Sequence, residues 1–187
     1  MNRRDSLQMI LTTSLTLGLA GLPVLARTAP ALTQQEINAM RNNWRDLAPV
    51  DYESPRPEDK VELSQEEWRD RLTAEQFRVM RKAGTEQAYT SPLNDESRDG
   101  LFVCLGCQLP LFTSAMKYDS GTGWPSFFTS IADVFATKTD FKLLWPRTEY
   151  HCRRCGSHHG HVFKDGPPPT GERWCNNGVA LKFIASD

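Results

Sequence analysis

Four of the five cysteines in this chain form two pairs, and this spacing predicts a metal site. Cys104 and Cys107 are separated by two residues, and so are Cys152 and Cys155. A C-x2-C turn points two thiolates at one ion, so the two pairs together supply four tetrahedral ligands. Four thiolates leave no open position for water, so the zinc favoured by this pattern is structural. Two alternatives stay open, a redox-active C-x-x-C pair or two disulfides in an exported protein.

The fifth cysteine, Cys175, stands alone in a polar segment, with Arg173 two residues before it. In a strand the two side chains share a face, and a fixed cation lowers the pKa of a neighbouring thiol. The thiolate form is the nucleophile, so this setting is typical of a reactive cysteine. The alternative is a structural cysteine that behaves as a small hydrophobic residue. The local sequence leaves both interpretations open.

Three histidines follow the second cysteine pair directly, at His158, His159 and His161. If this segment is extended, His159 and His161 share a face, whereas in a turn His158 and His161 converge. Imidazoles beside a thiolate are candidate proton donors, with zinc ligation and solvent exposure as alternatives. Between the cysteine pairs, Trp124 stands between a glycine and a proline, which indicates a rigid presented loop.

The elements that position these residues change in type along the chain. Capping boxes begin at Thr33, Ser64 and Thr73. They predict one amphipathic helix over residues 34–46 and two later short helices, the last ending at Gly84. After Gly100 the β-prone runs are LFVC, VFATK, FKLLW, EYHC, HVF and VALKFI. We therefore predict a mainly β fold, a small antiparallel sheet or barrel-like domain with short N-terminal helices.

Residues 1–26 have the pattern of a secretory signal peptide. Arg3 and Arg4 precede an apolar run that ends in Val24-Leu25-Ala26, a small-x-small motif. The paired arginines resemble a twin-arginine signal, with a Sec signal or an uncleaved membrane anchor as alternatives. We expect an exported, periplasmic protein. Residues 27–60 are then an N-terminal extension with a proline-rich linker, and residues 61–187 form the main domain.

Length and composition set the class of protein. The chain has 187 residues, of which 24% are charged and 39% are hydrophobic, as expected for one soluble globular domain. The formal net charge of −1 leaves no basic excess for a nucleic-acid backbone. Nothing in the sequence demands more than a monomer.

Five blocks of the sequence, in this order, resemble the B-type methionine sulfoxide reductases. They are Cys104-x2-Cys107, SGTGWPSF at 120–127, Cys152-x2-Cys155, GSHHGHVF at 156–163 and RWCNN at 173–177. The resemblance runs from about residue 63 to 183 and implies a β-rich fold with one structural Zn2+ on the four paired cysteines. It also implies that the Cys175 thiolate attacks the sulfur of methionine-R-sulfoxide, free or in proteins, and becomes a sulfenic acid.

The same resemblance assigns roles to residues around Cys175. His158 and His161 would donate and organise protons, Asp165 and Asn177 would orient that network, Arg173 would support the thiolate, and Trp124 and Phe127 would bind the substrate. His159 stands where the family usually has an apolar residue. Many relatives carry a resolving cysteine before Gly-Trp-Pro-Ser-Phe, but this sequence has Asp119-Ser-Gly-Thr122 there. We therefore expect an external thiol, either a small molecule or a thioredoxin-like protein, to restore Cys175.

Two other classes of protein compete with this interpretation. A zinc-ribbon interaction module would use the cysteine pairs for recognition and leave Cys175 inert. A cysteine hydrolase would use Cys175 and a histidine for acyl transfer, but the papain and caspase signatures are missing and the four-cysteine cage stays unexplained.

Overall fold

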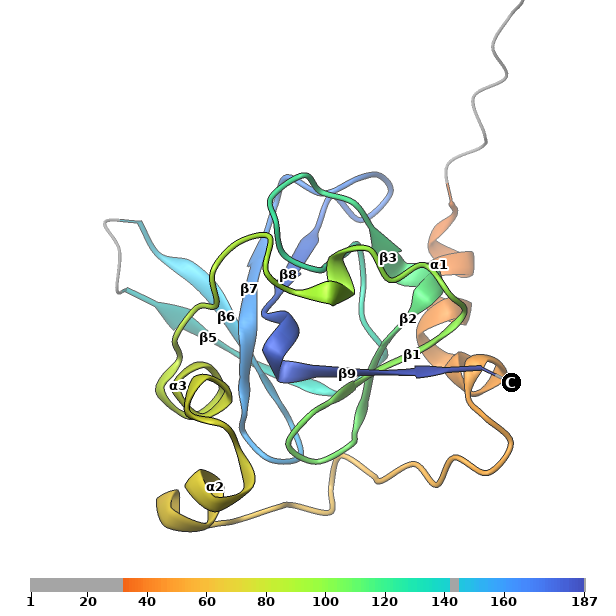
Figure 1. Ribbon diagram of the computed structural model, residues 1–187. Coiled ribbons are helices and arrows are strands. Elements are labelled where there is room, and N and C mark those ends of the chain that lie inside the picture. Colours follow the sequence, from red (N-terminus) through yellow and green to blue (C-terminus); the bar gives the residue numbers. More distant parts are fainter. Residues whose placement is uncertain (1–31, 142–144, 187) are drawn as a thin grey trace, which may run out of the picture. The chain divides into compact units, whose positions relative to one another are not determined.

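The computed structural model describes residues 32–141 and 145–186, so the predicted signal peptide, residues 1–26, lies outside the described residues. The described chain forms two antiparallel sheets preceded by three short α-helices (Figure 1). The predicted mainly β class with short N-terminal helices is confirmed. No helix within the described ranges is long and apolar enough to cross a membrane.

All three helices begin where the capping boxes predict. They are α1 (Gln34–Asn42), α2 (Gln65–Arg71) and α3 (Ala74–Lys82). In each, the N-cap hydroxyl accepts from the third backbone amide, and the side chain there accepts from the N-cap amide. The first helix is shorter than predicted, because it ends at Asn42 and a 3-10 helix follows at Trp44–Leu47. The Asn42 side chain donates to the Asn38 carbonyl, the local competition that makes asparagine a poor helix former.

Nine strands make up the two sheets. The smaller sheet has the order β2 (Pro110–Thr113), β1 (Gly100–Cys104), β9 (Leu181–Ala185). The larger has the order β3 (Lys117–Tyr118), β4 (Ser126–Phe127), β8 (Arg173–Asn176), β7 (His158–Phe163), β6 (Arg147–Cys152), β5 (Phe135–Asp140). The runs LFVC, VFATK, EYHC and HVF are strands as predicted. VALKFI is divided between a 3-10 turn at Gly178–Ala180 and β9.

The prediction of a strand at FKLLW, residues 141–145, is wrong. Phe141 and Trp145 are its two described residues, and neither lies in a strand. Strands β5 and β6 pair from Phe135 opposite Cys152 to Asp140 opposite Arg147. The chain must therefore reverse between Asp140 and Arg147. As a result, Phe141 and Trp145 lie in the connection, with 76% and 79% of their surfaces exposed.

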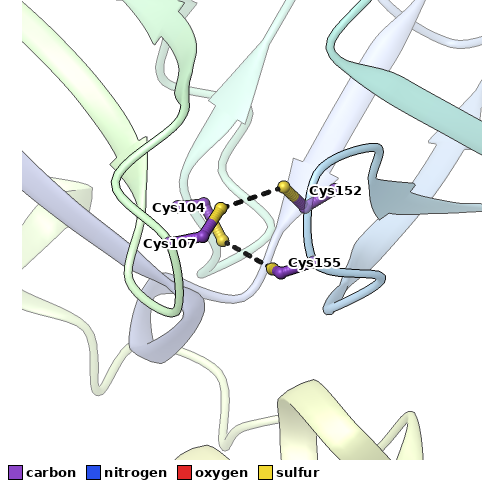
Figure 2. A group of neighbouring side chains, drawn as sticks. All are labelled: Cys104, Cys107, Cys152 and Cys155. Carbon is purple, nitrogen blue, oxygen red and sulfur yellow. Dashed lines mark hydrogen bonds between the residues drawn. The ribbon is translucent and has the colours of Figure 1, made fainter. Parts of the chain in front are cut away.

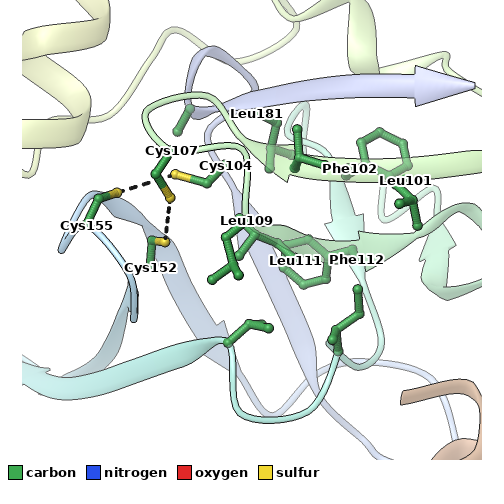
Figure 3. Close-up of a cluster of buried hydrophobic side chains, with 14 of the residues drawn as sticks. Leu101, Phe102, Cys104, Cys107, Leu109, Leu111, Phe112, Cys152, Cys155 and Leu181 are labelled. Atoms are coloured by element: carbon green, nitrogen blue, oxygen red, sulfur yellow. Dashed lines mark hydrogen bonds between the residues drawn. The ribbon is translucent and has the colours of Figure 1, made fainter. Parts of the chain in front are cut away.

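The hydrophobic core fills the space between the two sheets. Phe112 of β2 stacks on Phe127 of β4 with ring centroids 3.9 Å apart, and Phe102 of β1 meets the same ring edge-on at 5.1 Å. Figure 3 shows the four paired cysteines beside this cluster, continuous with Leu109 and Leu181. Apolar burial between the sheets thus fixes the frame on which the cysteines and histidines are placed.

Candidate active site and metal centre

One row of residues crosses five strands of the larger sheet. Cys175 on β8 lies opposite Ser126 on β4 and opposite His161 on β7. The row continues from His161 to Glu149 on β6 and Lys138 on β5. Directly opposed residues of an antiparallel pair project from the same face. The thiol, an imidazole and a carboxylate therefore stand side by side on one face of the sheet.

A β-bulge in β7 decides which histidines share this face. Tyr150 pairs with Gly160 and His151 with His158, so His159 is the extra residue. The bulge reverses the alternation, and the rings of His158 and His161 lie 5.6 Å apart. His159 is fully buried, parallel to the ring of Tyr150 at 6.4 Å. The sequence left open whether this segment is extended or forms a turn. The structure has a bulged strand, which brings His158 and His161 together.

Asn177 and Gly160 hold the bulge in place. The backbone amide of Asn177 donates to the His159 carbonyl at 2.8 Å, and its side-chain amide donates to the same oxygen at 2.9 Å. At Gly160 a Cβ atom would lie 1.9 Å from the carbonyl oxygen of Cys175. Only glycine allows β7 to approach β8 this closely beside Cys175. Asn177 therefore acts on the histidines through the backbone.

A cavity of about 100 Å³ opens beside Cys175. It is lined by Thr85, Trp124, Arg147, Gly160, His161, Phe163, Cys175, Asn176 and Asn177. The indole nitrogen of Trp124 donates to the Glu86 carbonyl at 3.3 Å, which fixes the ring as one wall. The cavity thus combines a thiol, an imidazole and two aromatic side chains in a space suited to a small group.

Burial raises the pKa of the Cys175 thiol, while Arg173 and a hydrogen bond from Thr122 oppose this rise. Arg173 is engaged by Asp165 through two hydrogen bonds of 2.9 Å, and the Asp165 charge raises the thiol pKa. The expected lowering of the Cys175 pKa by Arg173 is therefore outweighed. The reason is desolvation of the thiol, which the local sequence does not reveal.

The two site histidines have different carboxylate partners. His161 Nε2 lies 2.8 Å from Asp140 Oδ2, and His158 Nδ1 lies 2.6 Å from Glu149 Oε1. Burial lowers the pKa of both rings, to about 4 in His158, whereas the nearby carboxylates raise it. His161 lines the cavity beside Cys175, but His158 does not. His161 is therefore the imidazole with access to a bound group.

The four paired cysteines meet in one buried cluster, shown in Figure 2. The sulfur atoms of Cys104 and Cys155 are 3.6 Å apart, and those of Cys107 and Cys152 are 3.5 Å apart. All four sulfurs lie within 4.8 Å of one another. A disulfide needs about 2.05 Å, whereas tetrahedral ligands at about 2.3 Å from a zinc ion are about 3.8 Å apart. The cluster could thus bind a metal, and all five cysteines are free thiols.

Comparison with known proteins assigns this arrangement to a family. Residues 72–185 match the SelR domain. The chain belongs to the SelR family, the B-type methionine sulfoxide reductases. A Hahella chejuensis protein named peptide methionine sulfoxide reductase MsrB is 47% identical over 130 residues, covering 69% of this chain and 94% of that protein. The chloroplastic peptide methionine sulfoxide reductase B1 of Arabidopsis thaliana is 44% identical over 141 residues, covering 71% and 70%.

Two residues of this SelR domain lie elsewhere than expected. Phe127, expected at the substrate site, is fully buried in the core and does not line the cavity. Ser126 lies opposite Cys175 and projects from the same face of the sheet. Phe127, the next residue of the strand, must therefore point to the opposite face. Asp165, expected beside the histidines, pairs with Arg173 instead, and Asp140 contacts His161.

One residue that supports the site, Glu86, is not marked by any local sequence pattern. Glu86 is buried, and its carboxylate accepts from the amides of Gly178 and Val179 in the turn after Asn177. Its own amide donates to Asn177 Oδ1 at 2.9 Å. These partners are more than 90 positions away, so local spacing carries no trace of them. Glu86 lies within the resembling stretch from about residue 63 to 183, but in none of its five blocks.

Proposed function

We propose that this protein reduces methionine-R-sulfoxide, free or within proteins, to methionine. The observation that carries the proposal is the pairing of Cys175 with His161 across two strands, at a cavity walled by Trp124. This geometry occurs in a SelR domain whose relatives are named peptide methionine sulfoxide reductases. The relatives' names supply the substrate class, and the site supplies a nucleophile and a proton donor.

The reaction that fits these residues moves one oxygen atom and two electrons. The Cys175 thiolate attacks the sulfoxide sulfur, and a proton is delivered to the sulfoxide oxygen. The attack forms a bond between the two sulfurs, and the protonated oxygen then passes to the Cys175 sulfur. The sulfur–sulfur bond and the sulfur–oxygen bond of the substrate break, methionine leaves, and Cys175 is left as a sulfenic acid. The substrate sulfur is reduced by two electrons and the cysteine sulfur is oxidised by two.

His161 is the proton donor in this proposal. It lines the cavity, and Asp140 holds its ring and favours the charged form. His158 supports it from the same face, with its own ring fixed by Glu149. Arg173 favours the Cys175 thiolate, and Asp165 orients the guanidinium. Trp124 supplies a flat apolar wall for the S-methyl group.

An external thiol restores Cys175 in this mechanism. The other four cysteines are gathered in one buried cluster, so no further thiol of the described chain is free to form a disulfide with Cys175. A small-molecule thiol or a thioredoxin-like protein would attack the sulfenic acid, form a mixed disulfide and release water. A second thiol equivalent then frees Cys175.

The four-cysteine cluster fits a structural Zn2+. Four buried sulfurs would complete a tetrahedral shell with no position left for substrate. The ion would join the turn after β1 to the turn between β6 and β7, and would thereby stabilise the folded chain.

Export is proposed from residues 1–26 alone, whose pattern is that of a twin-arginine or Sec signal peptide. The substrates would then be oxidised methionines of envelope proteins. Cell fractionation tests this, because a mature chain found only in the cytoplasm would contradict it.

Turnover of a racemic methionine sulfoxide derivative with dithiothreitol, followed by chiral chromatography, tests the activity. We expect the wild type to consume only the R epimer and to stop at half conversion. Cys175→Ser should be inactive while keeping its metal content and thermal stability, because Cys175 lies outside the metal cluster. A folded, zinc-loaded wild type that consumes neither epimer would overturn the proposal in favour of an interaction module.

A further inference from the structure

One of the four histidines, His151, has no part in the proposed reaction. It lies on β6, two residues after Glu149, and is paired across the strands with His158 on β7. Alternate residues of a strand project from one face, and the β7 bulge returns His158 to that same face. The rings of His151 and His158 are 5.7 Å apart. Two imidazoles and a carboxylate therefore converge at one place on the sheet.

Glu149 is the centre of this group. Its Oε1 atom lies 2.6 Å from Nδ1 of His158 and 2.7 Å from Nε2 of His151. Each of the three residues can supply a donor atom, and these atoms lie within 4.8 Å of one another. Ligands about 2.1 Å from one ion and at right angles are about 3.0 Å apart. Small shifts of the three side chains thus make them ligands of one metal ion.

The burial of His158 is a second, independent indication of a ligand. His158 is 2% exposed, and its Nε2 atom is buried without a hydrogen-bond partner in the part of the chain that the structure describes. Buried polar atoms without a partner are rare, and such an atom points to an ion or a water that completes the site. This observation concerns the same ring that Glu149 holds at Nδ1.

A cavity of about 640 Å³ gives access to the group. His151 and His158 line it, together with residues of α3 and β5. Glu149 is buried next to both rings. The cavity therefore offers an ion a route from solvent and space for water molecules as further ligands.

The group is separate from the four-cysteine cluster, although His151 directly precedes Cys152. Neighbouring residues of a strand project from opposite faces, so the His151 ring and the Cys152 sulfur point away from each other. Asp140, Glu149 and His161 also have the spacing of metal ligands. They offer one imidazole rather than two, and Asp140 is already paired with Arg147 at 2.6 Å.

The charges around the cavity select the kind of ion. The cationic side chains in its wall are Lys60, Arg81, Lys138 and Arg153. Lys138 Nζ lies 3.5 Å from Oε2 of Glu149. Positive charge and a single carboxylate disfavour Mg2+ and Ca2+, which need several oxygen ligands. Imidazole nitrogens instead suit first-row transition metals and zinc.

We propose that Glu149, His151 and His158 bind a divalent transition-metal ion at a second site, which is reached through this cavity and is distinct from the cluster of four cysteines. Water molecules from the cavity complete the coordination of the ion. The inference does not depend on the proposed reductase function.

Titration of the untagged, zinc-loaded full chain with Co2+, followed by absorption spectroscopy, tests the inference. Nitrogen and oxygen ligands give Co2+ weak visible bands, whereas thiolates add an intense charge-transfer band in the near ultraviolet. We expect a single additional Co2+ to bind without this band and without loss of zinc. Excess Mg2+ should not displace it.

Three variants locate the ion. His151→Gln should weaken Co2+ binding at least about tenfold, because losing only the hydrogen-bond partner of a metal ligand already costs that much. His159→Leu is the matched control, since it also removes a histidine but one that belongs to neither histidine-containing group; it should keep the wild-type affinity. Lys138→Ala, at a side chain that is 59% exposed, should bind Co2+ more tightly because a positive charge beside Glu149 is removed.

Four outcomes would overturn the inference. A wild type that takes up no Co2+ beyond its zinc is the first, and equal affinities in the wild type and His151→Gln are the second. A loss of affinity in His161→Gln but not in His151→Gln assigns the ion to the Asp140 group instead. A thiolate band assigns it to the cysteine cluster when zinc is lost, or to Cys175 when zinc is retained. Each of these measurements is read without turnover, so an inactive enzyme would refute only the proposed function.

Discussion

Arg173 and burial act in opposite directions on the Cys175 thiol. Burial raises its pKa, and the Arg173 charge and the Thr122 hydroxyl lower it. Asp165 has two effects, because it holds the guanidinium in place and also contributes a negative charge that raises the thiol pKa. The fraction of thiolate at neutral pH therefore depends on the balance between burial and Asp165, which raise the Cys175 pKa, and Arg173 and Thr122, which lower it.

Replacing Arg173 by Met should raise the Cys175 pKa further, because the largest factor that lowers it is removed. We expect alkylation of Cys175 by iodoacetamide at pH 7 to slow by about tenfold and its pH profile to move to higher pH. Peptide mass spectrometry isolates Cys175 from the clustered cysteines.

Arg56→Met is the matched control for this substitution. Arg56 makes a similar two-point contact with Asp59, at 3.2 Å and 2.8 Å, but does not line the cavity. Equal alkylation rates in Arg173→Met and Arg56→Met would refute a role of Arg173 in thiol activation.

The bulge in β7 is the element that arranges the three histidines of this strand. It places His158 and His161 on the same face of the sheet as Cys175 and sends His159 into the core. The buried His159 ring has a pKa lowered to about 3, chiefly by burial. In the unfolded chain the same imidazole titrates near its ordinary 6.5. Its contribution to stability is therefore complete above pH 6.5 and is lost progressively as the pH falls toward 3.

His159→Leu should make the protein less sensitive to acid. Between pH 6.5 and 3 the unfolded wild type binds a proton that the folded state excludes, which costs about 1.4 kcal/mol per pH unit. We expect the loss in unfolding free energy from pH 7.5 to 5.0 to be smaller by about 2 kcal/mol in the variant. Urea titrations at both pH values measure this difference, in which contributions shared by the two proteins cancel. If the unfolding free energy falls by the same amount in the wild type and in His159→Leu, His159 is protonated in the folded state.

Local signals explain which elements could be predicted from the sequence. A capping box involves residues three positions apart, so the starts of α1, α2 and α3 follow from the sequence alone. The cysteine pairs are also local, and their spacing indicated a metal cluster. The Asp140–His161 contact and the β7 bulge depend instead on how β5, β6 and β7 align. FKLLW has strand-forming residues, but the reversal between β5 and β6 overrides their preference.

At the scale of the whole molecule, an N-terminal segment, residues 52–61, contacts both turns that carry the paired cysteines. The Tyr52 hydroxyl donates to the carbonyl of Gln108, next to Cys107. On the second turn, Lys60 donates to the Arg153 carbonyl at 2.6 Å, and the Val61 amide donates to the Arg154 carbonyl at 3.0 Å. The match to the SelR domain begins only at residue 72, so these contacts come from a segment outside it.

We expect this segment to slow metal loss, because the two turns must separate before a four-thiolate ion can leave. Burial raises the pKa of Tyr52 to about 12, so its hydroxyl remains a hydrogen-bond donor at neutral pH. Tyr52→Phe removes that one bond, which is worth about 1 kcal/mol. Zinc release to a chromophoric chelator should then be about fivefold faster than in the wild type.

Tyr89→Phe provides the matched control for this release measurement. It removes a hydroxyl that donates to the Gly121 carbonyl at 2.7 Å, in a loop that holds none of the four clustered cysteines. The control should release zinc at the wild-type rate. If both phenylalanine variants release zinc equally fast, the effect reflects a general loss of stability. If Tyr52→Phe releases zinc no faster than the wild type, the bond from Tyr52 does not slow the separation of the two turns. A faster release in Tyr52→Phe alone would mean that the N-terminal segment and the zinc cluster form one stabilising unit, joined outside the matched domain.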